Sequence, residues 1–209
     1  MNKTLIAERL ADPKAKLVAV TKKHSKEEVD ELYALGVRTF GENRVQEFLE
    51  KYDPNYDWHL IGHLQTNKVK YIIGKVSLVE SVDSLKLARE IEKQAAKAGL
   101  VQDVLVEIKI SKQDENKTGL DPALLMDLLA EIEKMEHVRV KGLMTIASNT
   151  DDQTLIASEF DAARALFEKA KAQYPDMEIL SMGMSHDYPL AIAHGSNEVR
   201  IGTALFLPE

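Results

Sequence analysis

The stretch that decides the fold is Leu17-Val18-Ala19-Val20-Thr21-Lys22, an apolar run that ends at a lysine. Four consecutive small or branched apolar residues predict a strand buried on both faces, as in a parallel sheet covered by helices. At the carboxyl end of a barrel strand, Lys22 would point into the mouth where active sites gather. Partial desolvation there would favour a neutral amine that attacks an aldehyde and forms a Schiff base. The alternative is a solvated lysine that starts a loop, because most lysines are exposed.

Strand and helix patterns alternate along the rest of the chain. After Lys22, a capping box of Ser25 and Glu28 predicts a helix that ends before Gly36. Further strands are predicted at 37–41, 58–61, 76–82, 104–110, within 138–147, at 177–180 and at 199–201. Helices are predicted at 44–51, 66–73, 85–98, 121–135, 151–173 and 188–194, and a short amphipathic helix at 3–10 would cover the bottom of the fold.

This alternation predicts one α/β domain over residues 1–209, a (β/α)8 barrel of the TIM type. Seven of the eight predicted strands are followed by helices, and no linker or shift in composition marks a second domain. An open, doubly wound sheet stays an alternative, because several of the predicted strands are short.

Composition narrows the class of protein. The net charge of -7 is spread along the 209 residues without a basic block, which argues against nucleic acid or an anionic membrane as partner. Because the chain has no cysteine, it has no disulfide framework, thiol nucleophile or thiolate metal site. We find no apolar run with the length of a membrane span and no signal-peptide core, so we expect a cytoplasmic protein.

Polar groups follow several predicted strands and would therefore meet on one rim of a barrel. They are Lys22, Asn43, His63, Met144, the segment 181–185 and the segment 200–203. The segments after the seventh and eighth strands combine glycines with hydroxyl groups, which predicts a phosphate cradle. Turn chemistry and helix capping explain the same residues equally well.

Arg200 lies between Val199 and Ile201, so a guanidinium projects from a strand otherwise suited to burial. It needs an acceptor, either a carboxylate in a structural ion pair or a nitrogen in a ligand ring.

His59 and His63 have the spacing of a helical metal pair, but they fall on a strand and a turn. We therefore expect no metal site, and we expect His63 to form a wall of the ligand pocket. A serine hydrolase is not indicated, because no nucleophile elbow is present. The polar stretch 111–119 is expected to form a mobile loop over the mouth, in which Lys117 is either solvated or delivered to the ligand.

Six motifs taken together resemble the pyridoxal phosphate homeostasis protein family over nearly the whole chain. They are Ala19-Val20-Thr21-Lys22, Gly41-Glu42-Asn43, Trp58-His59-Leu60-Ile61-Gly62-His63-Leu64-Gln65, Lys141-Gly142-Leu143-Met144, Ser181-Met182-Gly183-Met184-Ser185 and Arg200-Ile201-Gly202-Thr203. The resemblance implies a barrel similar to the amino-terminal domain of alanine racemase. It also implies that pyridoxal 5'-phosphate (PLP) is bound, with Lys22 forming the Schiff base.

The same resemblance assigns further residues to the cofactor. Ser185, Gly202 and Thr203 match phosphate contacts, and Arg200 matches the arginine that faces the pyridine nitrogen. Weaker matches place four more residues near the cofactor: Asn43, His63, Ser181 and Met182.

The function implied is intracellular PLP (vitamin B6) homeostasis, in which the protein buffers PLP or delivers it to apo PLP-dependent enzymes. An arginine opposite the pyridine nitrogen weakens the ring as an electron sink, which argues against catalysis. A small PLP-dependent racemase or another Schiff-base enzyme is the alternative. We expect a monomer, and the amino-terminal segment, which is short compared with the family, leaves open whether an oligomeric contact is made there.

Overall fold

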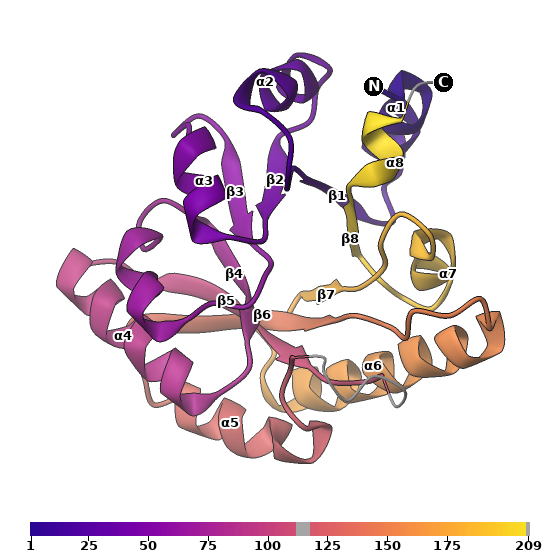
Figure 1. The fold of residues 1–209 in the computed structure, drawn as a ribbon. Helices are drawn as coiled ribbons and strands as arrows, with labels where there is room; N and C mark the ends of the chain where they lie inside the picture. Colours follow the sequence, from indigo (N-terminus) through magenta and orange to yellow (C-terminus); the bar gives the residue numbers. More distant parts are fainter. Residues whose placement is uncertain (112–117, 208–209) are drawn as a thin grey trace.

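The computed structural model describes residues 1–111 and 118–207 and contains a closed barrel of eight parallel strands in the order β1 to β8 (Figure 1). The strands are β1 (Lys16–Val20), β2 (Thr39–Glu42), β3 (Asp57–Leu60), β4 (Leu78–Val82), β5 (Gln102–Ile108), β6 (Val138–Thr145), β7 (Ile179–Ser181) and β8 (Glu198–Ile201). Because β1 pairs with both β2 and β8, the sheet has no free edge. The predicted barrel is confirmed, and the open sheet is excluded.

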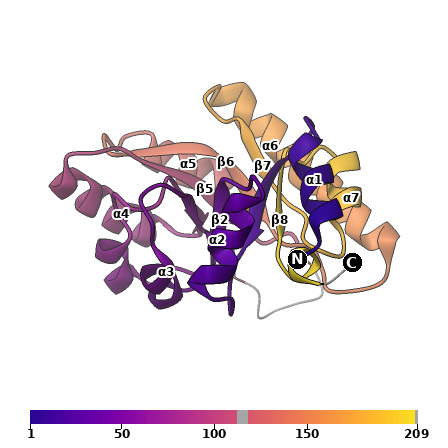
Figure 2. The ribbon, with the colours of Figure 1, turned by 90° about the horizontal axis from the view of Figure 1, so that it is seen from above.

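Helices surround the barrel in both views (Figures 1 and 2). They are α1 (Lys3–Ala11), α2 (Lys26–Ala34), α3 (Val45–Lys51), the 3-10 helix η1 (Thr66–Tyr71), α4 (Leu85–Ala98), the 3-10 helix η2 (Pro122–Leu124) with α5 (Leu125–Ile132), α6 (Gln153–Gln173), α7 (Tyr188–Ala193) and α8 (Thr203–Phe206). None of these described helices combines the length and the apolar composition that a membrane span needs.

The capping signals acted as the sequence predicted. Ser25 Oγ accepts the Glu28 amide at 3.3 Å, and the Glu28 carboxylate accepts the Ser25 amide at 2.7 Å, which completes the capping box of α2. Helix α4 ends at Gly99, whose φ of 65° is left-handed and suits glycine.

Four local expectations were wrong. The segment after β3, expected as a helix capped by Thr66, is a 3-10 helix without a side-chain cap, and the last strand is followed by the four-residue α8. In α3, the pattern places Leu49 inward with Val45 and Phe48, but Leu49 is exposed while Lys51 is buried. Helix α1 packs against α8 and β1 on the side of the barrel, where the Asn2 amide donates to the Leu205 carbonyl at 2.8 Å.

The side chains of β1 alternate between two environments, which defines the two faces of the barrel wall. Leu17 and Ala19 belong to the hydrophobic core shared with the helices. Val18 and Val20 face the interior, because a Cβ added at Gly41 would meet Val18 and one added at Gly202 would meet Val20. Strand β1 ends at Val20, and Lys22 lies two residues beyond it at the carboxyl rim.

Candidate functional site

Lys22 lies in the turn that follows β1, at the carboxyl rim. The His24 amide closes this turn on the Thr21 carbonyl at 3.1 Å, and Lys23 adopts a φ of 66°. Of the described residues, Lys23 is the only non-glycine with a positive φ, a conformation that costs about 1 kcal/mol. Lys22 itself is exposed, so the desolvation that the sequence suggested is not present in this structure.

A buried network that the sequence did not reveal holds this turn. Lys51 Nζ donates to the Thr21 carbonyl at 2.8 Å and to Glu42 Oε1 at 2.6 Å. The Thr21 hydroxyl donates to the same Glu42 oxygen at 2.7 Å. On the solvent side, the Lys23 amide donates to Glu47 at 3.0 Å. Two carboxylates and a buried lysine therefore fix the backbone on both sides of Lys22.

The predicted phosphate residues come together at the ends of β7 and β8. Ser185 Oγ lies 3.3 Å from the Gly202 amide nitrogen and 3.4 Å from that of Ala204, while Thr203 is exposed at the start of α8. A side chain at position 202 would crowd Val20, because its Cβ would lie 3.2 Å from Val20 Cβ. Glycine at position 202 therefore lets the chain pass close to β1. The Ser185 hydroxyl and the amides of Gly202 and Ala204 lie together there.

A ring contact joins these donors to the Lys22 turn. The His24 imidazole stacks on the Phe206 ring with a centroid distance of 3.4 Å and an interplanar angle of 8°. The turn after β1 and α8 after β8 are thus held side by side across the β1–β8 seam (Figure 1).

Asn43 and His63 line one hollow at the rim, together with residues of the β2–α3 and β3–η1 connections. Asn43 Oδ1 is buried and has no hydrogen-bond partner, whereas the His63 side chain is 54% exposed with Nδ1 3.6 Å from Asp83 Oδ2. Gly62 permits this arrangement, because a Cβ there would lie 2.3 Å from the Asn43 carbonyl oxygen. Among the described residues, this amide oxygen is therefore a buried acceptor without a hydrogen-bond donor.

Arg200 is buried inside the barrel, and none of the carboxylates in residues 1–111 and 118–207 lies at hydrogen-bond distance from it. Its guanidinium donates to Ser181 Oγ at 2.7 Å and to the Thr145 carbonyl at 2.8 Å, while the Glu80 carboxylate lies 4.0 Å away. Ser181 therefore lies beside Arg200 in the interior. The Met182 side chain is fully buried in the hydrophobic core and offers no polar atom to the rim.

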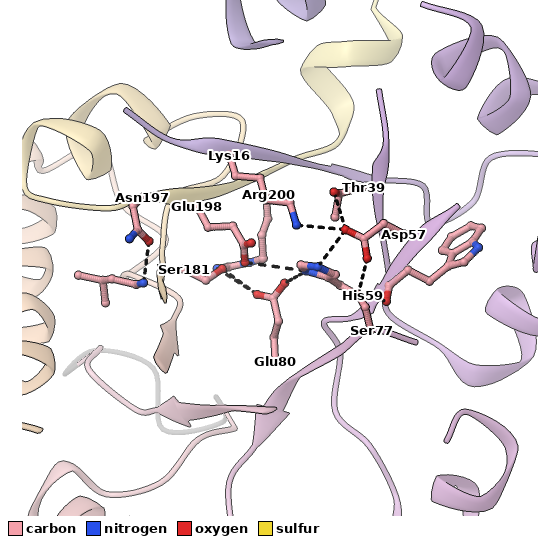
Figure 3. Close-up of polar contacts among 12 residues, drawn as sticks. Lys16, Thr39, Asp57, His59, Ser77, Glu80, Ser181, Asn197, Glu198 and Arg200 are labelled. Carbon is pink, nitrogen blue, oxygen red and sulfur yellow. Dashed lines mark hydrogen bonds and ion pairs between the residues drawn. The ribbon is translucent and has the colours of Figure 1, made fainter. Parts of the chain in front are cut away.

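The barrel interior holds charged residues that the sequence analysis did not assign (Figure 3). His59 and Glu80 are joined at 2.7 Å, Glu198 Oε1 lies 3.9 Å from His59, and Lys16 pairs with Asp57 at 3.1 Å. A signal was present in the sequence, because Glu80 interrupts an apolar strand and Glu198 alternates with Arg200 on β8. His63 is at the rim, so His59 and His63 do not form a pair.

The protonation of this interior follows from its contacts. Burial raises the pKa of Glu198 to about 7, and the nearby Glu80 carboxylate adds to the shift. Burial opposes ionisation of Glu80 as well, but the hydrogen bond from His59 and the nearby charges of His59 and Arg200 together bring its pKa below the ordinary value. Burial lowers the pKa of His59, but the hydrogen bond to Glu80 and the nearby charges of Glu198 and Glu80 together outweigh burial and raise it. His59 and Glu80 therefore form an ion pair, with Glu198 as a titrating neighbour.

The predicted mobile loop is described only at its ends. Ser111 and Ser148 share a hydrogen bond of 2.7 Å, and the Thr118 hydroxyl donates to Glu107 at 2.8 Å. Residues 112–117, with Lys117, lie outside the described part of the chain.

An amine, a group of hydroxyl and amide donors and a buried arginine around one barrel mouth define a ligand-binding barrel. The family model for the alanine racemase N-terminal domain matches residues 2–209. A pyridoxal phosphate homeostasis protein of Aquifex aeolicus is 44% identical over 197 residues, covering 92% of this chain and 86% of the relative. The pyridoxal phosphate homeostasis protein of Schizosaccharomyces pombe is 38% identical, and the match covers 91% of this chain and 82% of that relative. The chain belongs to the pyridoxal phosphate homeostasis protein family.

Solved structures agree with this assignment. PipY of Synechococcus elongatus with PLP bound superposes with a TM-score of 0.88 at 36% identity, covering 97% of this chain and all of that one. The form without PLP gives a TM-score of 0.90 at 38% identity, with the same coverage. Alanine racemase of Clostridium difficile shares the fold, with a TM-score of 0.80 at 18% identity. The superposition includes 99% of this chain and 56% of the racemase chain.

Proposed function

We propose that this chain binds PLP at the barrel mouth and buffers the free cofactor, without a catalytic reaction of its own. The observation that carries the proposal is the contact between the Lys22 turn and α8 through His24 and Phe206, at a centroid distance of 3.4 Å. This contact puts an amine and the donors around Ser185 on the same side of one mouth. A ligand with both an aldehyde and a phosphate matches that pair of groups.

The residues of the mouth fit PLP in two further respects. Ser185, Gly202 and Thr203 offer hydroxyl and backbone donors to a phosphate, and Gly202 leaves the space that a Cβ would fill against Val20. Asn43 Oδ1, buried and without a partner, offers an acceptor to a polar substituent of the cofactor.

Lys22 supplies the covalent link in this proposal. When bound, the cofactor supplies an aldehyde that can be held covalently and released again. Lys22 would hold that aldehyde through its amine, in a C=N bond that forms with loss of one water molecule. Hydrolysis or exchange with another amine reverses the step, so the link is suited to storage.

The charge of Arg200 argues against catalysis by the bound cofactor. A guanidinium is permanently charged, so beside the pyridine nitrogen it would oppose protonation of that nitrogen and limit the ring as an electron sink. Curated relatives carry the name homeostasis protein, which agrees with a carrier. The alternative is a PLP-dependent racemase or another Schiff-base enzyme, and sustained turnover of any amino acid by the loaded protein would favour it.

Loss of the hydroxyl groups of Ser185 and Thr203 should weaken PLP binding selectively. In Ser185→Ala and Thr203→Val, each lost donor should cost on the order of 1 kcal/mol, or about fivefold in Kd. Pyridoxal, which lacks the phosphate, should bind the variants and the parent equally. Titration of both ligands measures the difference, and Ser158→Ala on the exposed side of α6 serves as the control. An unchanged preference for PLP over pyridoxal in both variants would remove the phosphate assignment.

We further propose that the protein, as a monomer, passes PLP to apo PLP-dependent enzymes. To test delivery, the loaded protein is mixed with an apo enzyme in the presence of a scavenger of free PLP. Recovery of enzyme activity faster than PLP dissociates into solution is the expected result. Recovery at the dissociation rate would reject directed delivery and leave passive buffering.

A further inference from the structure

The interior of the barrel contains one continuous polar path that ends at Arg200. The register pairs Lys16 with Glu198 and Val18 with Arg200, so Arg200 lies one layer closer to the mouth than Glu198. Ser181, Glu80 and His59 follow below it, on β7, β4 and β3 (Figure 3). These side chains come from separate strands and point toward one another inside the barrel.

The hydrogen bonds of the path have a fixed direction. Ser181 Oγ donates its single proton to Glu80 Oε2 at 2.7 Å, so its lone pairs accept the guanidinium of Arg200, also at 2.7 Å. Glu80 Oε1 accepts from His59 Nδ1 at 2.7 Å, which places a proton on that nitrogen. Each carboxylate oxygen of Glu80 is therefore used once, and the carboxylate cannot rotate without breaking a buried bond.

The Glu80 carboxylate lies near the Arg200 guanidinium but does not form a hydrogen bond with it. Glu80 Oε2 lies 4.0 Å from the guanidinium, with the Ser181 hydroxyl as the link, and both Glu80 and Arg200 are almost fully buried. A direct bidentate pair would occupy two guanidinium nitrogens, as carboxylates usually do with arginine. Here Arg200 keeps its charge compensated through a neutral hydroxyl and a backbone carbonyl.

The cluster is balanced by the protein's own charges. His59, Glu80 and Glu198 have potential ligand atoms within 4.8 Å of one another, a spacing that would also suit a metal ion. Arg200 lies beside Glu80, and Lys16 pairs with Asp57 on the other side of His59. The permanent charge of Arg200, 4.0 Å from Glu80, disfavours a divalent ion, so we interpret the cluster as an ion-pair network.

We propose that Glu80, held by His59, is the residue that positions Arg200 in the barrel mouth. Through the Ser181 hydroxyl, Glu80 fixes where the guanidinium lies. Glu80 touches no ligand, so it is a positioning residue. The effect on a ligand rests on the proposed PLP function, whereas the effect on Arg200 itself does not.

The first test uses the protein without ligand. In the parent, the guanidinium nitrogens held by Ser181 and Thr145 should give separate, slowly exchanging signals in nitrogen NMR of arginine-labelled protein. In Glu80→Gln the signals should average, because the amide cannot provide a carboxylate oxygen to the Ser181 proton without turning away from His59. Ser181→Ala removes the link but keeps the ion pair between Glu80 and His59, and it should give the same averaging. This second variant keeps the test valid if Glu80→Gln does not fold.

The second test uses protein loaded with nitrogen-labelled PLP. The ring-nitrogen signal should be that of the unprotonated ring in the parent and should move toward the protonated position in Glu80→Gln, because a displaced guanidinium no longer opposes protonation. In an Arg200→Lys background the same Glu80→Gln change should add at most a small further shift, because the two residues act as one unit. Glu159→Gln, at a buried carboxylate in α6 that bonds Ser148, is the matched control and should leave both signals unchanged.

The outcomes separate the two proposals. Unaltered guanidinium signals in both Glu80→Gln and Ser181→Ala would overturn the positioning role, whatever the protein binds. Averaged guanidinium signals in both variants, together with a parent protein that takes up no PLP, would support the positioning role and contradict the proposed function.

Discussion

Replacing Lys51 by methionine is expected to lower the free energy of unfolding by about 3 kcal/mol or more, because it leaves Glu42 buried without its cationic partner. The Glu42 side chain is fully buried and that of Lys51 is 7% exposed, and their atoms are 2.6 Å apart. Lys51 also donates to the Thr21 carbonyl at 2.8 Å, and that bond would be lost too. The effect should therefore be much larger than that of a surface ion pair, which typically contributes less than 1 kcal/mol.

Urea unfolding monitored by circular dichroism measures the difference. Lys134→Met is the control, since Lys134 pairs with Glu131 on the exposed surface, and it should change stability by less than about 0.5 kcal/mol. The double variant Lys51→Met with Glu42→Gln should recover part of the loss, because no uncompensated charge then remains buried. If Lys51→Met and Lys134→Met cost the same, the buried network does not support the Lys22 turn as described.

The fold could be predicted from the sequence because its signals are local and repeated. Apolar runs ending in polar residues marked the strands, and the capping box at Ser25 and the glycine at position 99 marked helix ends. Parallel strands joined by helices then leave few ways to bury every strand, and barrel closure is one of them. Boundaries were less certain, so β2 begins at Thr39 and β7 at Ile179, each two residues later than predicted.

Short elements escaped prediction because they contain too few residues for a periodic pattern. Helix α8 has four residues, and the segment after β3 forms a 3-10 helix. The exposed Leu49 and the buried Lys51 show a second limit. Leu49 faces water because an exposed apolar side chain on a helix costs little free energy. Lys51 is buried because Glu42, a carboxylate on the separate strand β2, accepts its hydrogen bond.

The candidate site was predictable at the rim and much less so in the interior. Lys22, Ser185 and Gly202 follow strand ends, and topology alone brings strand ends together. The partners of Arg200 could not be identified, because the sequence analysis treated the strand interiors as apolar and overlooked Glu80. Pairing between Ser181 and Glu80 spans 101 residues, and only the closed barrel makes them neighbours.

Lys22→Ala is expected to abolish covalent attachment of PLP completely, because Lys22 is the amine that the proposed function assigns to the aldehyde. Lys23→Ala is the matched control, because Lys23 is the next residue in the same exposed turn and its backbone amide, which bonds Glu47, is retained. The parent and Lys23→Ala should both show the visible absorbance of a Schiff base, and Lys22→Ala should lack it.

Borohydride reduction of the PLP-loaded protein, followed by mass analysis of its peptides, tests the central claim most directly. Reduction converts the reversible C=N bond into a stable amine, so the label records which lysine held the aldehyde. We predict one label per chain, on Lys22. A label on Lys23 or on another lysine, or no label on any lysine after loading, would contradict the claim that this barrel holds PLP through Lys22.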